Sequence, residues 1–358
     1  MATRVLQAVS SPRFFSAALL LILLTVARPG PTWSLQVHAQ EPAPAQAPAS
    51  AVSAASGASP DRSGGGLKHA RLANRTAIYR KPDLAGRPVR NAGVGFLMYT
   101  VEGPLEVGAE PWYKLRSGGY VQAANVQIVE PTAFHGIALK TDPPHPFGWL
   151  FRPARTVPAP GAAIPADAPE LPRYTYCEIL EEARDASGES WVRIGPDRWV
   201  QAAALRRVQV AKRPAGVRPG DLWIEIQLGQ QTVAAYQGDR MVYASLISSG
   251  LDRFPTQQGL FTVGSRHRLD KMSGLAGTPD FYWVQDVPHA LFFHGGTALH
   301  GAYWHDKFGT QVSHGCVNLP PEDAKWIWDW SAHATGRPLR IWVHSTSEHP
   351  APSDPSTR

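Results

Sequence analysis

The stretch LWIEIQL, residues 222–228, alternates strictly between two kinds of side chain. Its aliphatic residues occupy every second position and should face one way, while Trp223, Glu225 and Gln227 should face the other. A period of two is that of a β-strand, whose successive side chains point to opposite faces of a sheet. The stretch therefore predicts a strand with one apolar face at the start of the C-terminal part of the chain.

The residues that follow extend this strand into a sheet. QTVAAY at 231–236 and MVYASLI at 241–247 are separated by a short turn sequence and together indicate a β-hairpin. GLFTVGS at 259–265 is a further strand candidate. We therefore expect residues 218–345 to form one mostly β unit.

The first long helical pattern comes late in the chain. A pair of prolines at 320–321 precedes EDAKWIWDWSAHA, residues 322–334, which places acidic residues in the first turn, where the helix dipole favours them. Trp326, Ile327 and Trp330 should share one face of this helix. We interpret that face as part of the core.

Two segments nearer the N-terminus resemble each other. WYKLRSGGYVQAANV at 112–126 aligns with WVRIGPDRWVQAAAL at 191–205, a constant offset of 79 residues. Short alternating strands with turns between them indicate small β-barrels. The pattern resembles that of bacterial SH3-like domains, over residues 67–130 and 131–210. That resemblance implies docking onto cell-wall peptide, with a plain spacer as the alternative.

The N-terminus has the pattern of an export signal. FFSAALLLILLTVA at 14–27 would form a helix of roughly 21 Å, shorter than the ~30 Å hydrocarbon core of a bilayer. VHA at 37–39 offers the small residues of a cleavage site. Residues 1–39 are thus predicted to be a signal peptide, with an uncleaved membrane anchor as the alternative. Residues 40–66, rich in Pro, Ala, Ser and Gly, are predicted to be a flexible linker, and residues 346–358 a disordered tail.

Charge and cysteine content narrow the function classes. The formal charge is +6, but three arginines precede residue 40, and without them it is +3. A charge this mild suits an anionic envelope and gives no reason to expect nucleic acid as a partner. The chain has two cysteines, Cys177 and Cys316. Cys177 lies in an alternating run and is expected in the core, although a disulfide between the two stays open; an exported, unpaired Cys316 needs a chemical reason.

Cys316 lies in VSHGCVNL, residues 312–319, where its neighbours suit a nucleophile. A thiol that attacks a carbonyl must become a thiolate, and the oxyanion that forms needs hydrogen-bond donors. Gly315 lets the backbone turn so that its amide and that of Cys316 converge on one point, and His314 adds an imidazole. We therefore expect these groups to hold an oxyanion.

The base is expected on another strand, so that it faces the sulfur. FFHGGTALHGAYWH at 292–305 offers that strand. In it His300 precedes Gly301, whose unobstructed carbonyl can fix the tautomer of the imidazole. A neighbouring imidazole should also lower the pKa of the Cys316 thiol below its ordinary value of about 8.5.

Two other interpretations of this cysteine stay open. It could be a structural residue, although several imidazoles around a core thiol would be an unusual way to fill space. It could also bind a metal, but the histidine spacings fit no common zinc pattern. The metal set would be His294, His300, His305, His314 and Cys316. The chain has no GxSxG, SxxK, HExxH or P-loop motif, so other familiar nucleophiles and metal sites are disfavoured.

The run from HG at 300–301 through SHGC at 313–316 to Asn318 resembles the catalytic signature of L,D-transpeptidases of the YkuD type. These are bacterial envelope enzymes that remodel peptidoglycan. The resemblance implies a β-sandwich catalytic domain that needs no metal or cofactor. The family usually has Thr-Pro where this chain has FPTQQG, and often has Arg where Asn318 stands. Related runs are SSG at 248–250, PTQQGLFTV at 255–263 and GRPLRIWV at 336–343.

The resemblance assigns a role to each residue of the signature. Cys316 would attack the carbonyl of the third, L-centred residue of a stem tetrapeptide and expel the terminal D-alanine. His300, oriented by the Gly301 carbonyl, would take the thiol proton and later serve the incoming amine. His314 and the amides of Gly315 and Cys316 would hold the oxyanion.

The same resemblance places Asn318 and Trp304 in the substrate pocket and gives Ser313 a supporting role in the loop. It implies peptidoglycan stem peptides as partners and carbapenem-type β-lactams as inhibitors. The chain is thus predicted to be mainly β: two small SH3-like β-barrels, then a β-sandwich catalytic domain with one main α-helix, exported to the bacterial cell envelope. Because every candidate catalytic residue lies in 218–345, this unit is expected to process small muropeptides without residues 67–210.

Two alternative functions remain. An L,D-carboxypeptidase would pass the same thioacyl group to water instead of an amine, a choice that depends on the shape of the cleft. A non-catalytic wall-binding protein would use only its SH3-like units. His300 and Cys316 argue against the second alternative, because a binder has no use for them.

Overall fold

The computed structural model describes residues 67–334 and 336–345. This part of the chain is mainly β, with one α-helix and two short 3-10 helices, as the sequence predicted. The predictions for residues 1–39, 40–66 and 346–358 lie outside the described residues. Within the described ranges, no helix has the length and apolar character needed to cross a membrane.

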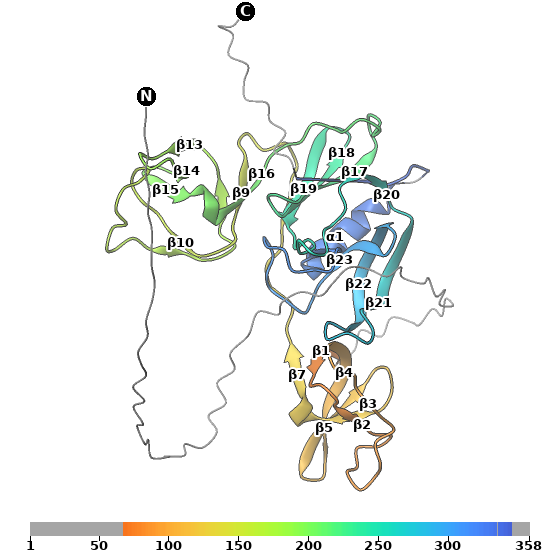
Figure 1. Cartoon of the computed structure of the whole chain (residues 1–358). Coiled ribbons are helices and arrows are strands. Elements are labelled where there is room, and N and C mark those ends of the chain that lie inside the picture. Colours follow the sequence, from red (N-terminus) through yellow and green to blue (C-terminus); the bar gives the residue numbers. More distant parts are fainter. Residues whose placement is uncertain (1–66, 335, 346–358) are drawn as a thin grey trace, which may run out of the picture. The chain divides into compact units, whose positions relative to one another are not determined.

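A six-stranded sheet carries the stretch that begins the C-terminal part (Figure 1). Its strands are β8 (Ile137–Ala138), β17 (Leu222–Gln227), β18 (Thr232–Gln237), β19 (Arg240–Leu246), β20 (Gly259–Thr262) and β25 (Arg340–His344). They lie in the order β20–β25–β17–β18–β19–β8, with the predicted hairpin formed by β18 and β19. Strand β8 comes from the range predicted for the second barrel, yet it pairs with β19.

Both faces of β17 are buried, which the alternating pattern alone did not reveal. Ile224 and Ile226 face a core that this sheet shares with a second sheet and the α-helix. Trp223 lies on the opposite face and stacks on Tyr236, with ring centroids 4.0 Å apart. Glu225 is buried beside it and accepts a hydrogen bond of 2.9 Å from the Tyr236 hydroxyl. A central strand thus packs its second face against another layer of side chains.

The second large sheet combines strands from both ends of the described chain. Its strands are β1 (Leu67–Leu72), β4 (Phe96–Val107), β5 (Glu110–Leu115), β6 (Tyr120–Gln122), β7 (Val126–Val129), β21 (Ser265–Gly274), β22 (Tyr282–His294), β23 (Thr297–Gly301) and β24 (Val317–Leu319). The path β24–β23–β22–β4–β1–β7 continues from the C-terminal strands into the N-terminal ones, because β22 pairs in parallel with β4. Strand β21 pairs with β22, and β5 lies between β4 and β6.

The two similar segments of the sequence fold alike. Residues 112–126 run from β5 through β6 and the 3-10 helix η1 (Ala123–Asn125) to β7, and residues 191–205 repeat this order.

We call residues 67–129 the first unit and residues 147–208 the second unit. The remaining elements are β2 (Ala77–Ile78), β3 (Arg90–Asn91), β9 (Phe147–Leu150), β10 (Ala154–Arg155), β11 (Glu170–Leu171), β12 (Tyr176–Glu178), β13 (Glu181–Arg184), β14 (Ser190–Gly195), β15 (Arg198–Gln201), η2 (Ala202–Ala204) and β16 (Leu205–Val208). In the second unit they form small sheets in the orders β12–β9–β16, β13–β14–β15 and β10–β11.

Helix α1 (Pro321–Ser331) begins at the second of the two prolines, as predicted. Ile327 is fully buried in the core between the sheets, and Trp326 and Trp330 are half-buried against it. Trp326 also stacks on Tyr243 of β19, with ring centroids 4.1 Å apart. The prediction that this face of the helix belongs to the core is confirmed.

A buried carboxylate fixes the start of α1 to the six-stranded sheet. Asp323 accepts hydrogen bonds from the Tyr243 hydroxyl at 2.7 Å, from the Gly136 amide at 2.9 Å and from the Ser245 hydroxyl. Burial raises the pKa of Asp323 to about 6.

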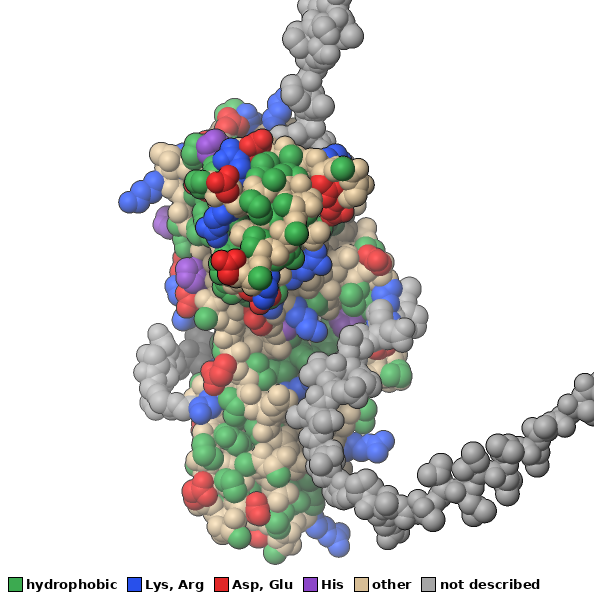
Figure 2. Space-filling model, turned by 90° about the vertical axis from the view of Figure 1, so that its left-hand side faces the viewer, with side chains coloured by type: hydrophobic (Ala, Val, Ile, Leu, Met, Phe, Trp, Pro, Cys, Tyr) green, Lys and Arg blue, Asp and Glu red, His purple; other side chains and the backbone are tan. Residues whose placement is uncertain are grey.

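On the face of the molecule that Figure 2 shows, acidic and basic side chains are interspersed.

Candidate active site

Cys316 lies immediately before β24, the strand that runs parallel to β23. Gly315 has a φ of +114°, in the region that favours glycine, so the chain can turn from the preceding loop into the strand. The Cys316 side chain is half-buried, and its sulfur lies 3.5 Å from the Ala298 amide nitrogen of β23. The thiol is thus fixed at the edge of the sheet between two parallel strands.

His300 lies on β23, opposite Asn318 of β24. Because side chains alternate along a strand, this register places His300 and Cys316 on the same face of the sheet. The imidazole is 2% exposed, and its Nδ1 lies 3.0 Å from the Gly301 carbonyl oxygen. Nδ1 must therefore donate to that carbonyl, which leaves the lone pair of the neutral ring on Nε2. The contact between His300 and the Gly301 carbonyl is the one that the sequence predicted, while the role of His300 as a base stays a prediction.

The resting charges of the two groups differ from the expectation. Burial raises the pKa of the Cys316 thiol, and the nearby Ala298 amide offsets this only in part. Burial also lowers the pKa of His300 to about 4. The expected lowering of the thiol pKa is therefore wrong for the resting protein, because desolvation disfavours both the thiolate and the imidazolium. At neutral pH the pair is a neutral thiol and a neutral imidazole.

The backbone around the sulfur offers one of the two amides expected for an oxyanion. The Gly315 amide donates a hydrogen bond of 3.1 Å to Ser313 Oγ, and that hydroxyl donates to the Cys316 carbonyl at 2.5 Å. Thr256 Oγ1 donates to the Gly315 carbonyl at 2.9 Å. The Gly315 amide is thus already engaged, because Ser313 closes a tight turn around it. That the Cys316 amide serves as a donor to an oxyanion stays a prediction.

His314 is exposed and lies between two aromatic rings. Its ring centroid is 5.3 Å from that of Tyr282, nearly parallel to it, and 4.8 Å from that of Phe254. Partial desolvation of the ring lowers the pKa of His314, so it is a neutral polar group at neutral pH. Tyr282 begins β22, and burial, with a smaller contribution from the nearby Cys316 side chain, raises its pKa to about 12. Tyr282 could not be predicted from the sequence, because it is distant from the SHGC motif along the chain and no motif marks it.

Asn318 and Trp304 both lie near His300. The Trp304 ring centroid is 5.7 Å from that of His300. The Asn318 side-chain amide is buried and lies 2.9 Å from Nε2 of His305, a residue considered from the sequence only as a metal ligand. Burial and the nearby His300 lower the pKa of His305 to about 3. The Lys307 amide nitrogen lies 3.2 Å from Nδ1 of the same ring.

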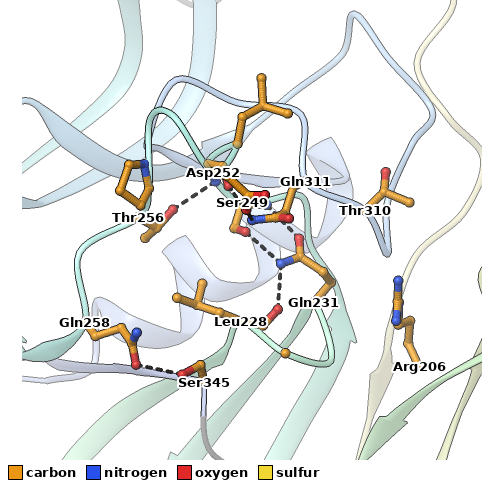
Figure 3. Close-up of a pocket in the computed structure, with 14 residues that line it drawn as sticks. Arg206, Leu228, Gln231, Ser249, Asp252, Thr256, Gln258, Thr310, Gln311 and Ser345 are labelled. Atoms are coloured by element: carbon orange, nitrogen blue, oxygen red, sulfur yellow. Dashed lines mark hydrogen bonds between the residues drawn. The ribbon is translucent and has the colours of Figure 1, made fainter. Parts of the chain in front are cut away.

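A pocket of about 640 Å³ lies behind the SHGC turn (Figure 3). Gly250 and Thr256 line it, and both contact the turn: Gly250 pairs with Ser313, and Thr256 binds the Gly315 carbonyl. Most of its lining residues carry polar side chains, and the Gln231 side chain donates a hydrogen bond of 2.7 Å to Ser249 Oγ. The described lining does not include Cys316 or His300, so this pocket is distinct from the space around those two side chains.

Cys177 is buried on β12 in a cluster of aliphatic side chains, as the sequence predicted. Both cysteines are free thiols, so the alternative of a disulfide between them is wrong. His294, at the end of β22, packs by the ring of Phe261 with centroids 4.9 Å apart. Among the described residues, no group of three His, Cys, Asp or Glu side chains is placed to hold a metal ion.

The comparison with protein families identifies the part of the chain that holds this site. Residues 221–344 match the family model of the L,D-transpeptidase catalytic domain, YkuD. L,D-transpeptidase 2 of Mycobacterium tuberculosis is 33% identical over 93 residues, which cover 23% of this chain and 22% of that protein. YciB of Bacillus subtilis is 29% identical over 121 residues, which cover 32% of this chain and 62% of YciB. The chain thus spans less than two thirds of the length of either relative.

Among solved structures, an L,D-transpeptidase from Mycobacterium smegmatis aligns at 16% identity over 71% of this chain and 95% of its own, with a TM-score of 0.32. The E. faecium catalytic domain acylated by ertapenem aligns at 23% identity over 36% of this chain and all of its own, with a TM-score of 0.31. The sequence matches carry the assignment. Residues 221–344 thus carry a domain similar to the L,D-transpeptidase catalytic domain.

Proposed function

We propose that this chain joins peptidoglycan stem peptides through a thioacyl-enzyme on Cys316. The observation that carries the proposal is the geometry of two adjacent parallel strands. Cys316 and His300 share one face, and the Gly301 carbonyl holds the proton of His300 on Nδ1. The free lone pair on Nε2 can therefore accept the thiol proton, which is the requirement for a general base.

Acylation begins from the neutral pair. As the sulfur attacks the carbonyl carbon of the third stem residue, the thiol proton moves to Nε2 of His300, so that no isolated buried charge exists beforehand. The Cys316 amide, with His314 beside it, donates to the oxyanion that forms. The tetrahedral intermediate then collapses, its C–N bond breaks, and His300 returns the proton to the departing amine of D-alanine.

Deacylation uses the same groups in reverse. An acceptor amine attacks the thioester carbonyl and gives a proton to His300. The C–S bond then breaks, and the proton passes to the leaving thiolate, which restores the neutral pair. Tyr282, Trp304 and Asn318 shape the walls around the reacting atoms, and Ser313 fixes the turn on which the Cys316 amide is carried.

The setting of the reaction follows from the same family. We place the protein in the bacterial cell envelope, outside the cytoplasm, with residues 1–39 as its export signal or anchor. The two repeated units resemble SH3-like domains in sequence, and their strands and side chains continue into the sheet and core of the C-terminal part. A carbapenem is a suitable probe, because its strained carbonyl offers the same electrophile to the sulfur.

Incubation with disaccharide-tetrapeptide tests this function. Transpeptidation gives a cross-linked dimer that has lost one D-alanine, which mass spectrometry identifies. Monomeric disaccharide-tripeptide would instead mean that water is the acceptor and that the enzyme is an L,D-carboxypeptidase. Unchanged substrate, with an intact Cys316, would favour a wall-binding role.

A further inference from the structure

The loop that joins His300 to the SHGC motif is held by both N-terminal units. We call residues 302–312 the bridging loop. It follows β23 and ends just before Ser313. It carries Trp304 and His305, the two side chains beside the proposed base and Asn318. Residues of the first unit contact its beginning, and residues of the second unit contact its end.

The end of the bridging loop is part of a core shared with the second unit. Phe308 is fully buried, in one cluster with Phe147 and Trp149 of β9 and with Val208 of β16. The same cluster includes residues of β17, β18 and β19. Removal of the second unit would expose this apolar cluster to water, so the unit is no detachable module.

Polar contacts from the second unit fix the same part of the loop. Arg206 Nε donates a hydrogen bond of 2.7 Å to the Gly309 carbonyl, while its guanidinium lies over the ring of Phe151, 3.8 Å from the centroid. A Cβ atom at Gly309 would lie 2.7 Å from Phe151, so the loop backbone and the second unit are in close contact. The ring and the carbonyl together determine the orientation of Arg206.

Asp306 provides a second polar attachment. Its carboxylate accepts a hydrogen bond of 2.8 Å from the Tyr174 hydroxyl and lies 3.4 Å from the guanidinium of Arg173. Tyr174 and Arg173 both precede β12 of the second unit. Because Asp306 follows His305 directly, this contact fixes the backbone next to that imidazole.

The beginning of the loop packs on the first unit. The ring of Tyr303 stacks on His69 of β1, with centroids 3.6 Å apart, and shares a cluster with Met98 of β4. Its hydroxyl donates to the Gln285 carbonyl at 2.6 Å. Tyr303, which directly precedes Trp304, therefore links the start of the bridging loop to the first unit and to strand β22.

Short contacts lead from the loop to the proposed base and nucleophile. The ring centroids of Phe308 and His305 are 4.9 Å apart, and His305 bonds to Asn318, two residues after Cys316. Trp304 lies beside His300. A shift of the loop would therefore move the groups next to the proposed base and would admit water to His300.

We propose that the N-terminal units are positioning elements of the catalytic centre, acting through the bridging loop, with Arg206 and Tyr174 as positioning residues. The inference rests on the proposed cysteine chemistry. It opposes the expectation from the sequence that residues 218–345 suffice for turnover of small muropeptides. Small displacements of aligned groups cost about a hundredfold in rate, so contacts distant from the chemistry can matter.

The test uses the full chain with three substitutions. Arg206→Gln removes the donor to Gly309, and Tyr174→Phe removes the donor to Asp306 while keeping the ring. The control, Arg193→Gln, breaks the exposed Arg193–Glu181 pair of the same unit, which does not contact the bridging loop. The readouts are the rate of carbapenem acylation at saturation, the carbapenem concentration at half-maximal rate, and the pH dependence of that rate.

We expect Arg206→Gln and Tyr174→Phe to lower the saturating rate about tenfold, with little change in the half-maximal concentration. Water that reaches His300 should raise its pKa. The pH below which the acylation rate falls should then move upwards from near 4, towards the ordinary histidine value of about 6.5. Arg193→Gln should behave like the wild type. If Arg206→Gln and Tyr174→Phe both kept the wild-type saturating rate and the wild-type pH dependence of that rate, the proposal would be overturned.

Alkylation by iodoacetamide separates this inference from the proposed function. If the wild type forms no acyl adduct, the proposed function fails, but the exposure of Cys316 can still be measured. A loosened loop should speed alkylation of Cys316 in Arg206→Gln and Tyr174→Phe, and not in Arg193→Gln. Equal alkylation rates in all four proteins would overturn the positioning role independently of the chemistry.

Discussion

The two cysteines lie in similar backbone settings and in different chemical ones. Both are free, both lie on or beside a β-strand, and burial raises the pKa of both thiols, that of Cys177 to about 11. Cys177 is 4% exposed among aliphatic side chains, with the Thr175 carbonyl 3.6 Å from its sulfur. Cys316 is half-buried and shares a face with His300. Burial and thiol pKa therefore do not distinguish a nucleophile from a core residue; the base beside it does.

Replacement of each cysteine by alanine should show the largest difference between the two residues. Cys316→Ala should abolish release of D-alanine, because no other group can form the thioester, while the loss of one sulfur atom leaves the fold intact. Cys177→Ala should keep turnover near the wild-type value. Chromatography of the products of disaccharide-tetrapeptide measures both, and circular dichroism checks the fold. Loss of turnover in folded Cys177→Ala would assign the wrong cysteine.

Removal of the base gives the next largest effect. His300→Gln keeps a polar side chain but cannot accept the thiol proton, so acylation by a carbapenem should slow by about 10²–10⁴-fold. Stopped-flow absorbance of the β-lactam measures the rate. His344 is a buried histidine of β25, bonded to Glu225, and a His344→Gln variant serves as the control, with a much smaller expected effect on acylation. An unchanged rate in His300→Gln would remove that residue from the mechanism.

Ser313→Ala should have a smaller effect on the same rate. It removes the hydroxyl that bonds to the Gly315 amide and the Cys316 carbonyl, so the turn that carries the Cys316 amide is less well fixed. One such hydrogen bond contributes about 1 kcal/mol, which corresponds to a loss of about fivefold to tenfold in acylation rate. Ser187→Ala, in the exposed turn with Asp185, is the matched control. A rate equal to that of the control would show that the turn does not depend on Ser313.

The pH dependence of alkylation compares the two thiols directly. Since burial raises both pKa values, the rate of iodoacetamide modification should keep rising above pH 8.5, about the ordinary thiol value. The half-buried Cys316 should react before Cys177, which should be modified only when the chain unfolds. Peptide mapping assigns the sites. Fast alkylation of Cys316 at pH 6 that disappears in His300→Gln would instead reveal a preformed thiolate–imidazolium pair.

The smallest expected effect belongs to the stability of the core cysteine. Cys177→Ala removes one buried atom from a cluster of aliphatic side chains and should cost about 1 kcal/mol of unfolding free energy. The melting temperature should fall by about 2–4 °C. Thermal unfolding followed by circular dichroism measures this shift. A stability equal to that of the wild type would mean that the cluster closes around the missing atom.

The sequence predicted those features that depend on local pattern. The strand at 222–228, the hairpin after it, the helix behind the two prolines and the matching folds of the two similar segments follow from periodicity and turn residues. The relation of His300 to the Gly301 carbonyl also follows, because the two groups are adjacent in the chain. The assignment to the L,D-transpeptidase domain rested on several spaced motifs rather than on one tetrapeptide.

Features that depend on packing between distant segments were not predictable in this way. Tyr282 and His305 approach the centre only because β22, β23 and the bridging loop come together in space. The raised pKa of the Cys316 thiol reflects burial, which no spacing reveals. The contacts of Arg206 and Tyr174 with the bridging loop join segments more than a hundred residues apart, and so the sequence suggested two detachable units instead.

Trapping of the acyl-enzyme tests the central claim most directly. Wild-type protein mixed with disaccharide-tetrapeptide in the absence of an acceptor amine, quenched in acid and measured by intact-mass spectrometry, should carry one disaccharide-tripeptide acyl group. Peptide mapping should place it on Cys316, with one free D-alanine released for each adduct. Release of D-alanine with no adduct on Cys316 at any quench time, or the same adduct on Cys316→Ala, would contradict the account.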